Sequence, residues 1–429
     1  MKSRPYVLPG IFLALNSVGE MPAQDRPNRF YLTSPLSMSA GYDDNFVVNS
    51  RAEDDTVFNL ASPTFTWFRS THRTRFSADY QAEFEFFNLN PSLNAWNHSA
   101  TLRESYRINS RLSFDAGNAF LSTSDASRRL ADSRFLLPRG RFLQNSFFSG
   151  LQYRVDYRTK LFFRFDNAIT KMALTGPRAR RFDQMANAGT VTIDHTLNRQ
   201  HSITGSYAYL HVRQLDRTES EVDAYQPAHS LNAGYMYSLN SGLIIRATGG
   251  VVHGREVAYT AGGAVEKRLG GLWVMAGYQR YLSFFGGFAP SGGLAAGNIE
   301  FANGLAPSSV FQTVSLRVRG NLTRRIGVDI HGQRGHSNIA DWRVKSTVAQ
   351  SRLDYKLSER LAVFARAEYY GQNAGQFIDS PLARRRYVGG IEIILSRPPE
   401  PEDSLRRRGK IPVESAEPPA EPPLTPEEI

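Results

Sequence analysis

The stretch from Arg75 to Phe86 constrains the fold of this chain more than any other. Every second residue from Phe76 to Phe86 is Phe, Tyr or Ala, and the residues between them are Ser, Asp, Gln and Glu. Alternation over these eleven residues predicts a β-strand with one apolar and one polar face. A tilted strand needs about 9–11 residues to cross a bilayer. Because similar alternation recurs along the chain, we predict an all-β transmembrane antiparallel up-and-down β-barrel with its apolar face toward lipid.

The composition favours a membrane β-barrel over a helical membrane protein. Mean hydropathy is −0.38, and no run of 18 apolar residues follows the N-terminus, so no transmembrane helix is expected. Aromatic residues make up 12% of the chain, which suits the interfacial girdles of such barrels. The chain has no cysteine, which excludes disulfides and thiolate metal sites.

The positive charge is carried mainly by arginine, and the net charge is +11. Arginine binds planar anions in a bidentate manner. Three interpretations fit: a lumen for anionic solutes, a rim that holds lipid phosphates, and nucleic-acid binding. The arginines are spread over many expected strands and turns, and not over one recognition element. We therefore expect no nucleic-acid partner.

The chain is expected to divide into four parts. The first has a basic start and an apolar stretch typical of a secretory signal, and the last is rich in Pro and Glu and cannot bury a core. The parts are a signal peptide (1–23), an N-terminal periplasmic segment (24–33), the barrel (34–396) and a disordered periplasmic tail (397–429). The tail is either a spacer or a tether to a periplasmic partner or the cell wall. Together these features predict location in a bacterial outer membrane.

Short polar turns recur along the chain and are predicted to close hairpins. They are centred near Ser70, Ser110, Arg158, Arg199, Ser241, Gly270, Arg324 and Glu359. Longer polar or Gly-rich segments alternate with them: Val47–Asp55, Asn88–Ala95, Ser122–Arg141, Ala173–Phe182, Arg213–Ala224, Gly254–Ala258, Ser283–Ser309, Gly335–Trp342 and Gly371–Arg384. Short periplasmic turns and long outer loops are typical of outer-membrane barrels. Eight turns join sixteen strands, and one further strand at each end gives eighteen.

The polar face of the predicted strands is rich in charge. The residues expected to line the lumen are Asp79, Glu83, Glu85, Arg103, Arg107, Arg154, Arg164, Asp166, Arg317, Arg319, Arg352, Asp354, Arg366 and Glu368. Adjacent strands carry opposite signs, so these side chains are expected either to form a ladder of cross-strand ion pairs or to line a polar conduit with transverse fields. One set of residues can do both.

Some residues do not follow the alternation. Glu104 falls on the lipid face, where it is unfavourable away from the interface. Four aromatic residues fall inside, where they are expected to pack against lumen side chains or a folded loop: Phe148, Phe162, Trp273 and Phe364.

No catalytic constellation is evident. The chain has no P-loop and no nucleophile elbow. His195 and His201 flank one short turn and are expected to cap a hairpin, not to bind metal. Ser230 follows His229 directly, and neighbours on a strand point to opposite faces. We therefore expect no enzyme, no cofactor and no metal site.

Two loops carry a distinctive composition. Ser283–Ser309 is rich in Gly, Ala and Phe, so it is expected either to narrow the mouth of the barrel or to remain mobile outside it. Ser122–Arg141 is basic and is expected to meet lipopolysaccharide phosphates or an acidic glycan.

The last strand is predicted at about Tyr387–Leu395. Its Gly390, Ile393 and Leu395 resemble the Gly-x-x-apolar-x-apolar ending that the barrel-assembly machinery recognises. The strand lacks the terminal aromatic residue of that pattern, and the chain continues beyond it.

The first strand is predicted at about Pro35–Tyr42, and the residues around its exit carry a family resemblance. Gly41-Tyr42-Asp43-Asp44-Asn45, followed by Asp55-Thr56-Val57-Phe58-Asn59-Leu60-Ala61-Ser62-Pro63, resembles the start of a group of outer-membrane β-barrel porins. These are often associated with exopolysaccharide or capsule systems. The resemblance implies an outer-membrane pore or export role, with no particular substrate and no ligand residues.

An interior of about eighteen strands is wide enough for an aqueous channel. We predict a porin-like channel that passes polar solutes or polysaccharide across the outer membrane. A first alternative is a plugged structural barrel that acts with a periplasmic or cell-surface partner. A second alternative is a lipid-modifying enzyme. The expected partners are outer-membrane lipid, lipopolysaccharide and the barrel-assembly machinery.

Overall fold

The computed structural model describes most of the predicted barrel. The described residues are 29–32, 34–45, 54–125, 140–174, 181–215, 225–239, 242–254, 257–283, 309–339, 342–373 and 382–395. The predicted signal peptide, the tail and most of the Gly-rich loop lie outside these residues. Within them, no helix has the length and apolar character needed to cross a membrane.

Twenty strands and one short 3-10 helix, η1 (Pro91–Leu93), make up the described chain. The strands are β1 (Arg29–Leu32), β2 (Leu36–Asp43), β3 (Asp55–Ala61), β4 (Phe65–Ser70), β5 (Thr74–Phe87), β6 (Ala95–Arg107), β7 (Leu112–Thr123), β8 (Gly140–Arg154), β9 (Thr159–Leu174), β10 (Arg181–Thr196), β11 (His201–Gln214), β12 (Tyr225–Leu239), β13 (Leu243–His253), β14 (Val257–Leu269), β15 (Leu272–Ser283), β16 (Ser309–Asn321), β17 (Ile326–Ile339), β18 (Trp342–Lys356), β19 (Leu361–Asn373) and β20 (Leu382–Ile393).

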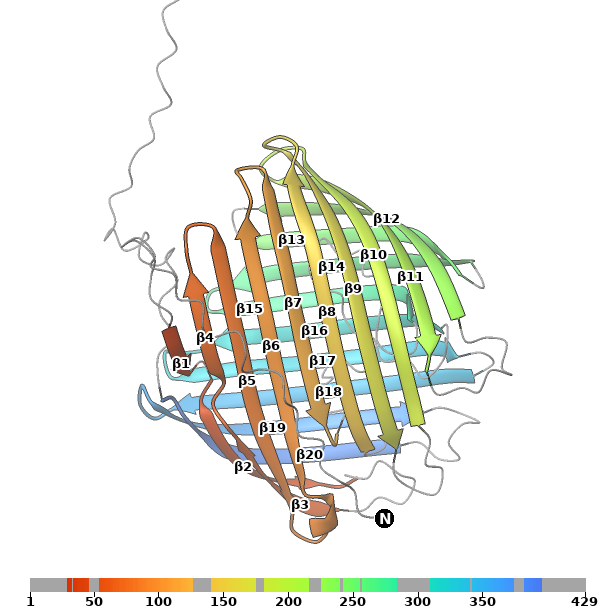
Figure 1. Cartoon of the computed structure of the whole chain (residues 1–429). Helices are drawn as coiled ribbons and strands as arrows, with labels where there is room; N and C mark the ends of the chain where they lie inside the picture. Colours follow the sequence, from red (N-terminus) through yellow and green to blue (C-terminus); the bar gives the residue numbers. More distant parts are fainter. Residues whose placement is uncertain are drawn as a thin grey trace, which may run out of the picture.

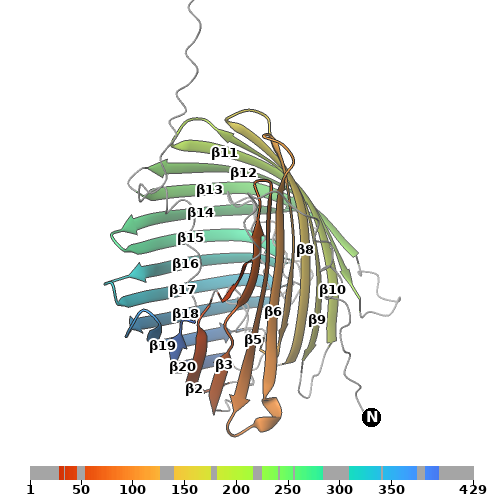
Figure 2. The same cartoon turned by 60° about the vertical axis from the view of Figure 1, so that its left-hand side comes forward.

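The strands close into one antiparallel barrel (Figure 1 and Figure 2). From β5 onward each strand pairs with the next in the sequence. β2 closes the wall by pairing with β20, from Leu36 opposite Ile393 to Asp43 opposite Arg386. β1 and β2 occupy one position in the wall, and β3 and β4 occupy the next. The wall therefore has eighteen strand positions, and the predicted 18-strand antiparallel barrel is confirmed.

The two interrupted positions break side by side at prolines. Pro35 precedes β2 and Pro63 separates β3 from β4, and a proline cannot donate to the ladder. Polar side chains replace the missing ladder bonds: the Thr64 N–H donates to Ser34 Oγ at 2.7 Å, and the Ala82 N–H donates to Ser62 Oγ at 3.0 Å.

All eight predicted short turns are present, and six of them share one hydrogen-bond pattern. A side-chain oxygen at the start of the turn accepts the backbone N–H groups of the residues two and three positions later, which closes a tight Asx or ST turn. The acceptors are Thr71, Asn109, Asp156, Asn198, Thr323 and Ser358. The other two turns use glycine with positive φ, Gly242 at 76° and Gly270 at 59°.

The turn between β8 and β9 is expected to make the stability of the barrel depend on pH. The N–H groups of Arg158 and Thr159 donate to Asp156 and hold the pKa of its carboxyl below the usual value. A lowered pKa in the folded state contributes stability above the unfolded-state pKa, and this contribution disappears as pH falls through the folded-state pKa. Asp156→Asn keeps an acceptor but cannot titrate. We expect the stability of this variant to fall less steeply at acid pH than that of the wild type, when heat-modified gel mobility measures the folded fraction at each pH. Equal pH dependence of the two proteins would contradict this account.

Strict alternation of short and long connections is wrong. The segments Gly254–Ala258 and Gly335–Trp342 were expected to be long loops, yet β14 begins only four residues after β13 ends, and β18 begins three residues after β17 ends. Backbone pairing continues through Gly335, which stands opposite Thr313 and Ser346. Ladder hydrogen bonds do not depend on the side chain, so small polar residues extend strands that their composition assigned to loops.

The two faces of the wall differ as the alternation predicts. On β5, Tyr80 and Phe86 are exposed on the outside, whereas Glu83 and Glu85 on the alternate face are buried. Exposed outward side chains on β8 to β11 are also large and apolar, including Leu151, Phe163, Phe165, Val191, Ile193 and Ile203. A closed barrel that exposes such a band requires lipid around it. The architecture is that of a transmembrane β-barrel with eighteen strand positions.

Candidate functional site

The candidate site is the inner face of the barrel. Strand register carries one face continuously around the wall, and all fourteen predicted residues lie on it: Asp79, Glu83, Glu85, Arg103, Arg107, Arg154, Arg164, Asp166, Arg317, Arg319, Arg352, Asp354, Arg366 and Glu368. The half of this face at the strand ends away from the short turns, here called the loop half, is largely buried. The half near the short turns is more exposed. The two halves therefore present different chemistry.

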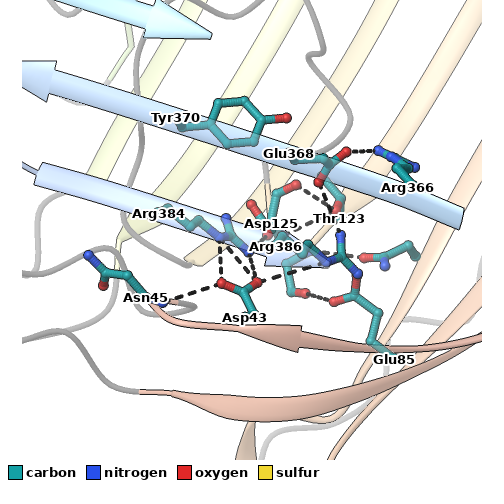
Figure 3. Close-up of polar contacts among 12 residues, drawn as sticks. Asp43, Asn45, Glu85, Thr123, Asp125, Arg366, Glu368, Tyr370, Arg384 and Arg386 are labelled. Atoms are coloured by element: carbon teal, nitrogen blue, oxygen red, sulfur yellow. Dashed lines mark hydrogen bonds and ion pairs between the residues drawn. The ribbon is translucent and has the colours of Figure 1, made fainter. Parts of the chain in front are cut away.

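A buried ion cluster lies at the seam where β20 meets β2 (Figure 3). Arg384 donates from Nε to Asp43 Oδ1 at 2.9 Å and from Nη2 to Asp43 Oδ2 at 2.6 Å. The same Nη2 donates to Asp125 Oδ2 at 2.9 Å. All three side chains are no more than 2% exposed. One guanidinium thus joins the first barrel strand, the last barrel strand and the segment that follows β7.

A second layer of charge adjoins this cluster along β19 and β20. Arg386 lies between two carboxylates, 3.9 Å from Asp43 and 3.8 Å from Glu368, and Arg366 pairs directly with Glu368 (Figure 3). Arg386 and Glu368 are buried. Buried charges of this kind persist only when they are paired, so the layer links the two strands through side chains as well as through the backbone.

The segment after β7 crosses the inside of the wall. The Ser124 N–H donates to Asn97 Oδ1 on β6 at 3.0 Å, and its Oγ donates to Glu85 Oε2 on β5 at 3.4 Å. Asp125 then reaches Arg384 on β20, beyond β3 and β2 in the wall. The start of this connection therefore lies over the inner face, close to the seam. The rest of the basic loop Ser122–Arg141, up to residue 139, lies outside the described residues.

The predicted ladder between adjacent strands is wrong in detail. Arg164–Asp166 (2.8 Å), Arg352–Asp354 (2.6 Å) and Arg366–Glu368 pair along single strands, two residues apart. Apart from the seam cluster, three pairs among the described residues join different strands: Arg246–Glu266, Arg317–Asp329 at 2.7 Å and Arg352–Glu392 at 2.7 Å. An arginine side chain is long enough to reach the residue two positions along the same strand. A carboxylate at that position therefore competes with one on the adjacent strand.

The acids of β5 and the arginines of β6 do not stand opposite each other. Glu85 faces Ala95, whereas Arg103 faces Ser77, nearer the short turns. Within the described chain neither Arg103 nor Arg107 forms an ion pair. The sequence predicted which face these residues share, but not their height in the wall.

Part of the inner face is apolar, which the alternation did not predict. Seven buried side chains from β9 to β13 form one cluster: Ala168, Ala186, Ala188, Leu210, Val212, Ala228 and Val252. They lie on the same face as Asp166, which stands opposite Ala188. This wall of the loop half is therefore poorly suited to holding water or ions.

Two of the four inward aromatic residues have a clear role. The guanidinium of Arg164 lies 4.5 Å from the ring centroid of Phe148, and that of Arg352 lies 4.5 Å from the ring centroid of Phe364. Each ring supports the arginine of an ion pair through a cation–π contact. Glu104 stands opposite Phe76 on the outside and is exposed, as its position in the alternation predicted.

The histidines with described partners bind single hydroxyl groups. His195 bonds Thr159 at 3.0 Å, His201 bonds Tyr235, and His229 bonds Tyr207 at 2.7 Å. Among the described residues, no three His, Cys, Asp or Glu side chains come together as metal ligands.

Sequence reasoning missed the central residues of the seam. Asp43 and Asp125 were placed at a strand exit and in a loop, and Arg384 was placed at the end of the long loop before the last strand. The run Ala383–Tyr387 does alternate, with buried Arg384 and Arg386 between exposed Ala383, Arg385 and Tyr387. Strand prediction expects apolar residues at buried positions, but here the buried positions hold arginine. The strand therefore begins at Leu382, five residues before the predicted start.

No family model matches the chain, and no curated protein matches it. Solved structures with a similar course include OccK2 (OpdF) of Pseudomonas aeruginosa, with 12% identity, 86% of this chain and 98% of that chain covered and a TM-score of 0.46. OccAB4 of Acinetobacter baumannii has 8% identity, the same coverage of 86% and 98%, and a TM-score of 0.45. The siderophore receptor PirA of Pseudomonas aeruginosa has 10% identity, coverage of 85% and 81%, and a TM-score of 0.38. These values assign no family, and the architecture stands on the strand pairing described above.

Proposed function

We propose that this chain is a porin-like channel of the outer membrane that passes polar solutes. The observation that carries the proposal is the inner face near the short turns, where charged side chains such as Arg107, Arg154 and Arg319 are exposed inside a closed wall. Charged residues that line a wide barrel support diffusion of hydrated solutes. No catalytic step is part of the proposal.

The resemblance of the opening strand to exopolysaccharide-associated porins extends this proposal to a glycan. A chain of sugars needs polar partners, and the inner face offers charged side chains near the short turns and again at the seam. The proposed partners are outer-membrane lipid and lipopolysaccharide around the wall, the barrel-assembly machinery during insertion, and a periplasmic partner for residues 397–429. A lipid-modifying activity is not proposed, because Ser230 is buried on the inner face whereas His229 is exposed on the outer face.

Single-channel conductance of the refolded protein in a planar bilayer tests the proposal. We expect steady, large steps and a reversal potential that shows preference for anions, because the exposed charges near the short turns are mainly arginine. Silence from protein that is folded and inserted would exclude an open porin.

A plugged barrel is the second candidate, and the buried loop half favours it. There the seam cluster and the apolar wall leave little exposed inner surface, and Asp125 anchors a crossing segment to Arg384. If the wild type is silent, Asp125→Asn should weaken this anchor and raise the frequency of open events. A silent wild type together with a silent Asp125→Asn variant would leave a purely structural barrel.

A further inference from the structure

A concave pocket lies inside the barrel at the end that carries the short turns. Its volume is about 540 Å³, and it is bounded by the β4–β5 turn, the β6–β7 turn and the end of β8. These hairpins are neighbours in the wall and end at the same rim (Figure 1). By the usual orientation of such barrels, this rim faces the periplasm.

The pocket is strongly and unusually basic. Five arginines and one histidine line it, and no carboxylate does: His72, Arg73, Arg75, Arg107, Arg111 and Arg154. All five arginines are exposed, and within the described chain none of them forms an ion pair. Like charges gathered in this way repel one another, so the arrangement opposes folding unless an anion compensates it.

Several arginines farther around the wall do have acidic partners. There Arg246, Arg317 and Arg352 each pair with at least one carboxylate. The pocket arginines differ from these three, whose charge is neutralised within the wall. At the pocket the inward positions beside the arginines hold serine: Ser105 stands opposite Arg75, and Ser113 stands opposite Arg107.

Serine at these positions does two things for a ligand. Its short side chain leaves the guanidinium groups accessible, and its hydroxyl adds a donor between them. Arginine presents a planar fork that binds two oxygens at once. Several forks around one concave space match a compact ligand with many oxygens and more than one negative charge.

We propose that this pocket is a binding site for polyvalent oxyanions of the phosphate type at the periplasmic mouth of the barrel. Binding there requires no conduction, but a role in loading solutes into the lumen rests on the proposed channel function. In that role the pocket raises the local concentration of anionic solutes on one wall of the entrance.

Tripolyphosphate is a suitable probe, and isothermal titration calorimetry of the folded protein in detergent measures its binding. The test variant is Arg75→Gln/Arg107→Gln/Arg154→Gln. The control, Arg268→Gln/Arg319→Gln/Arg325→Gln, removes the same charge from exposed arginines at the same end of the barrel but outside the pocket. We expect the test variant to lose affinity by about tenfold or more, since each charge-assisted contact is strong, and the control to change much less. Heat-modified gel mobility confirms that each variant is folded.

Two results would overturn the site. One is no binding by the wild type at low ionic strength, where charge attraction is greatest. The other is an equal loss in the test and control variants, which would indicate net charge in place of a defined pocket. Conductance without tripolyphosphate binding would refute this site and leave the channel intact. Binding by a barrel that never conducts would refute the channel and leave the site intact.

Discussion

Replacing Arg384 with methionine should lower the free energy of unfolding by about 3–5 kcal/mol, the loss typical of breaking a buried ion pair from one side. The substitution leaves Asp43 and Asp125 buried without their cation, and both carboxylates are within 2.9 Å of Arg384 in the native barrel. It also disconnects the segment after β7 from the seam. Urea titration in detergent, followed by tryptophan fluorescence, measures the change.

Arg385→Met is the matched control for this variant. Arg385 is the next residue on β20, but it points outward and is exposed. We expect an effect within about 0.5 kcal/mol, as for an ordinary surface substitution. Adding Asp43→Asn and Asp125→Asn to Arg384→Met should restore part of the stability, because it removes the uncompensated charge. Equal stability of the Arg384 and Arg385 variants would show that the cluster does not hold the seam.

Gly390→Ala should also destabilise the barrel, at the same seam but for a steric reason. A Cβ at Gly390 would lie 2.5 Å from the Met38 carbonyl oxygen and 2.6 Å from the Phe364 ring. The carbonyl belongs to the backbone of β2 and cannot move without disturbing the ladder. We expect a loss of about 1–3 kcal/mol, typical of overpacking, measured by the same urea titration.

Gly389→Ala provides the comparison, because its Cβ would come no closer than 4.0 Å to any neighbour. Gly390 is also part of the ending that resembles a signal for the barrel-assembly machinery. Refolding into detergent micelles without that machinery separates the two roles. A defect of Gly390→Ala in micelles identifies packing, whereas a defect confined to assembly in cells identifies recognition.

Periodicity predicted the wall of this protein well. The alternation on β5, repeated between short turns, gave the strand number, the antiparallel order and the face that each charged residue occupies. Turn positions were also predictable, because residues such as Asn109 and Asp156 close turns by local hydrogen bonds. These features depend on residues close in sequence, so a sequence pattern captures them.

The interior was less predictable because it depends on register between distant strands. The pairing of Arg384 with Asp43 follows from the closure of the wall and from no local pattern. The apolar inner wall around Leu210 was hidden for a related reason: where both faces are apolar, alternation no longer distinguishes them. The arginines of the basic pocket come from three strands and two turns, so they looked evenly dispersed along the chain.

The seam has a consequence for the order in which the barrel folds. Asp43 and Arg384 are separated by 341 residues, so their contact cannot form until both ends of the wall have come together. Contacts between such distant residues form late and slow the folding of β proteins. Until then the first strand has an unpaired edge and a carboxylate with no cation. The first strand is therefore the edge that stays open longest during folding, and the final strand is the element that closes it.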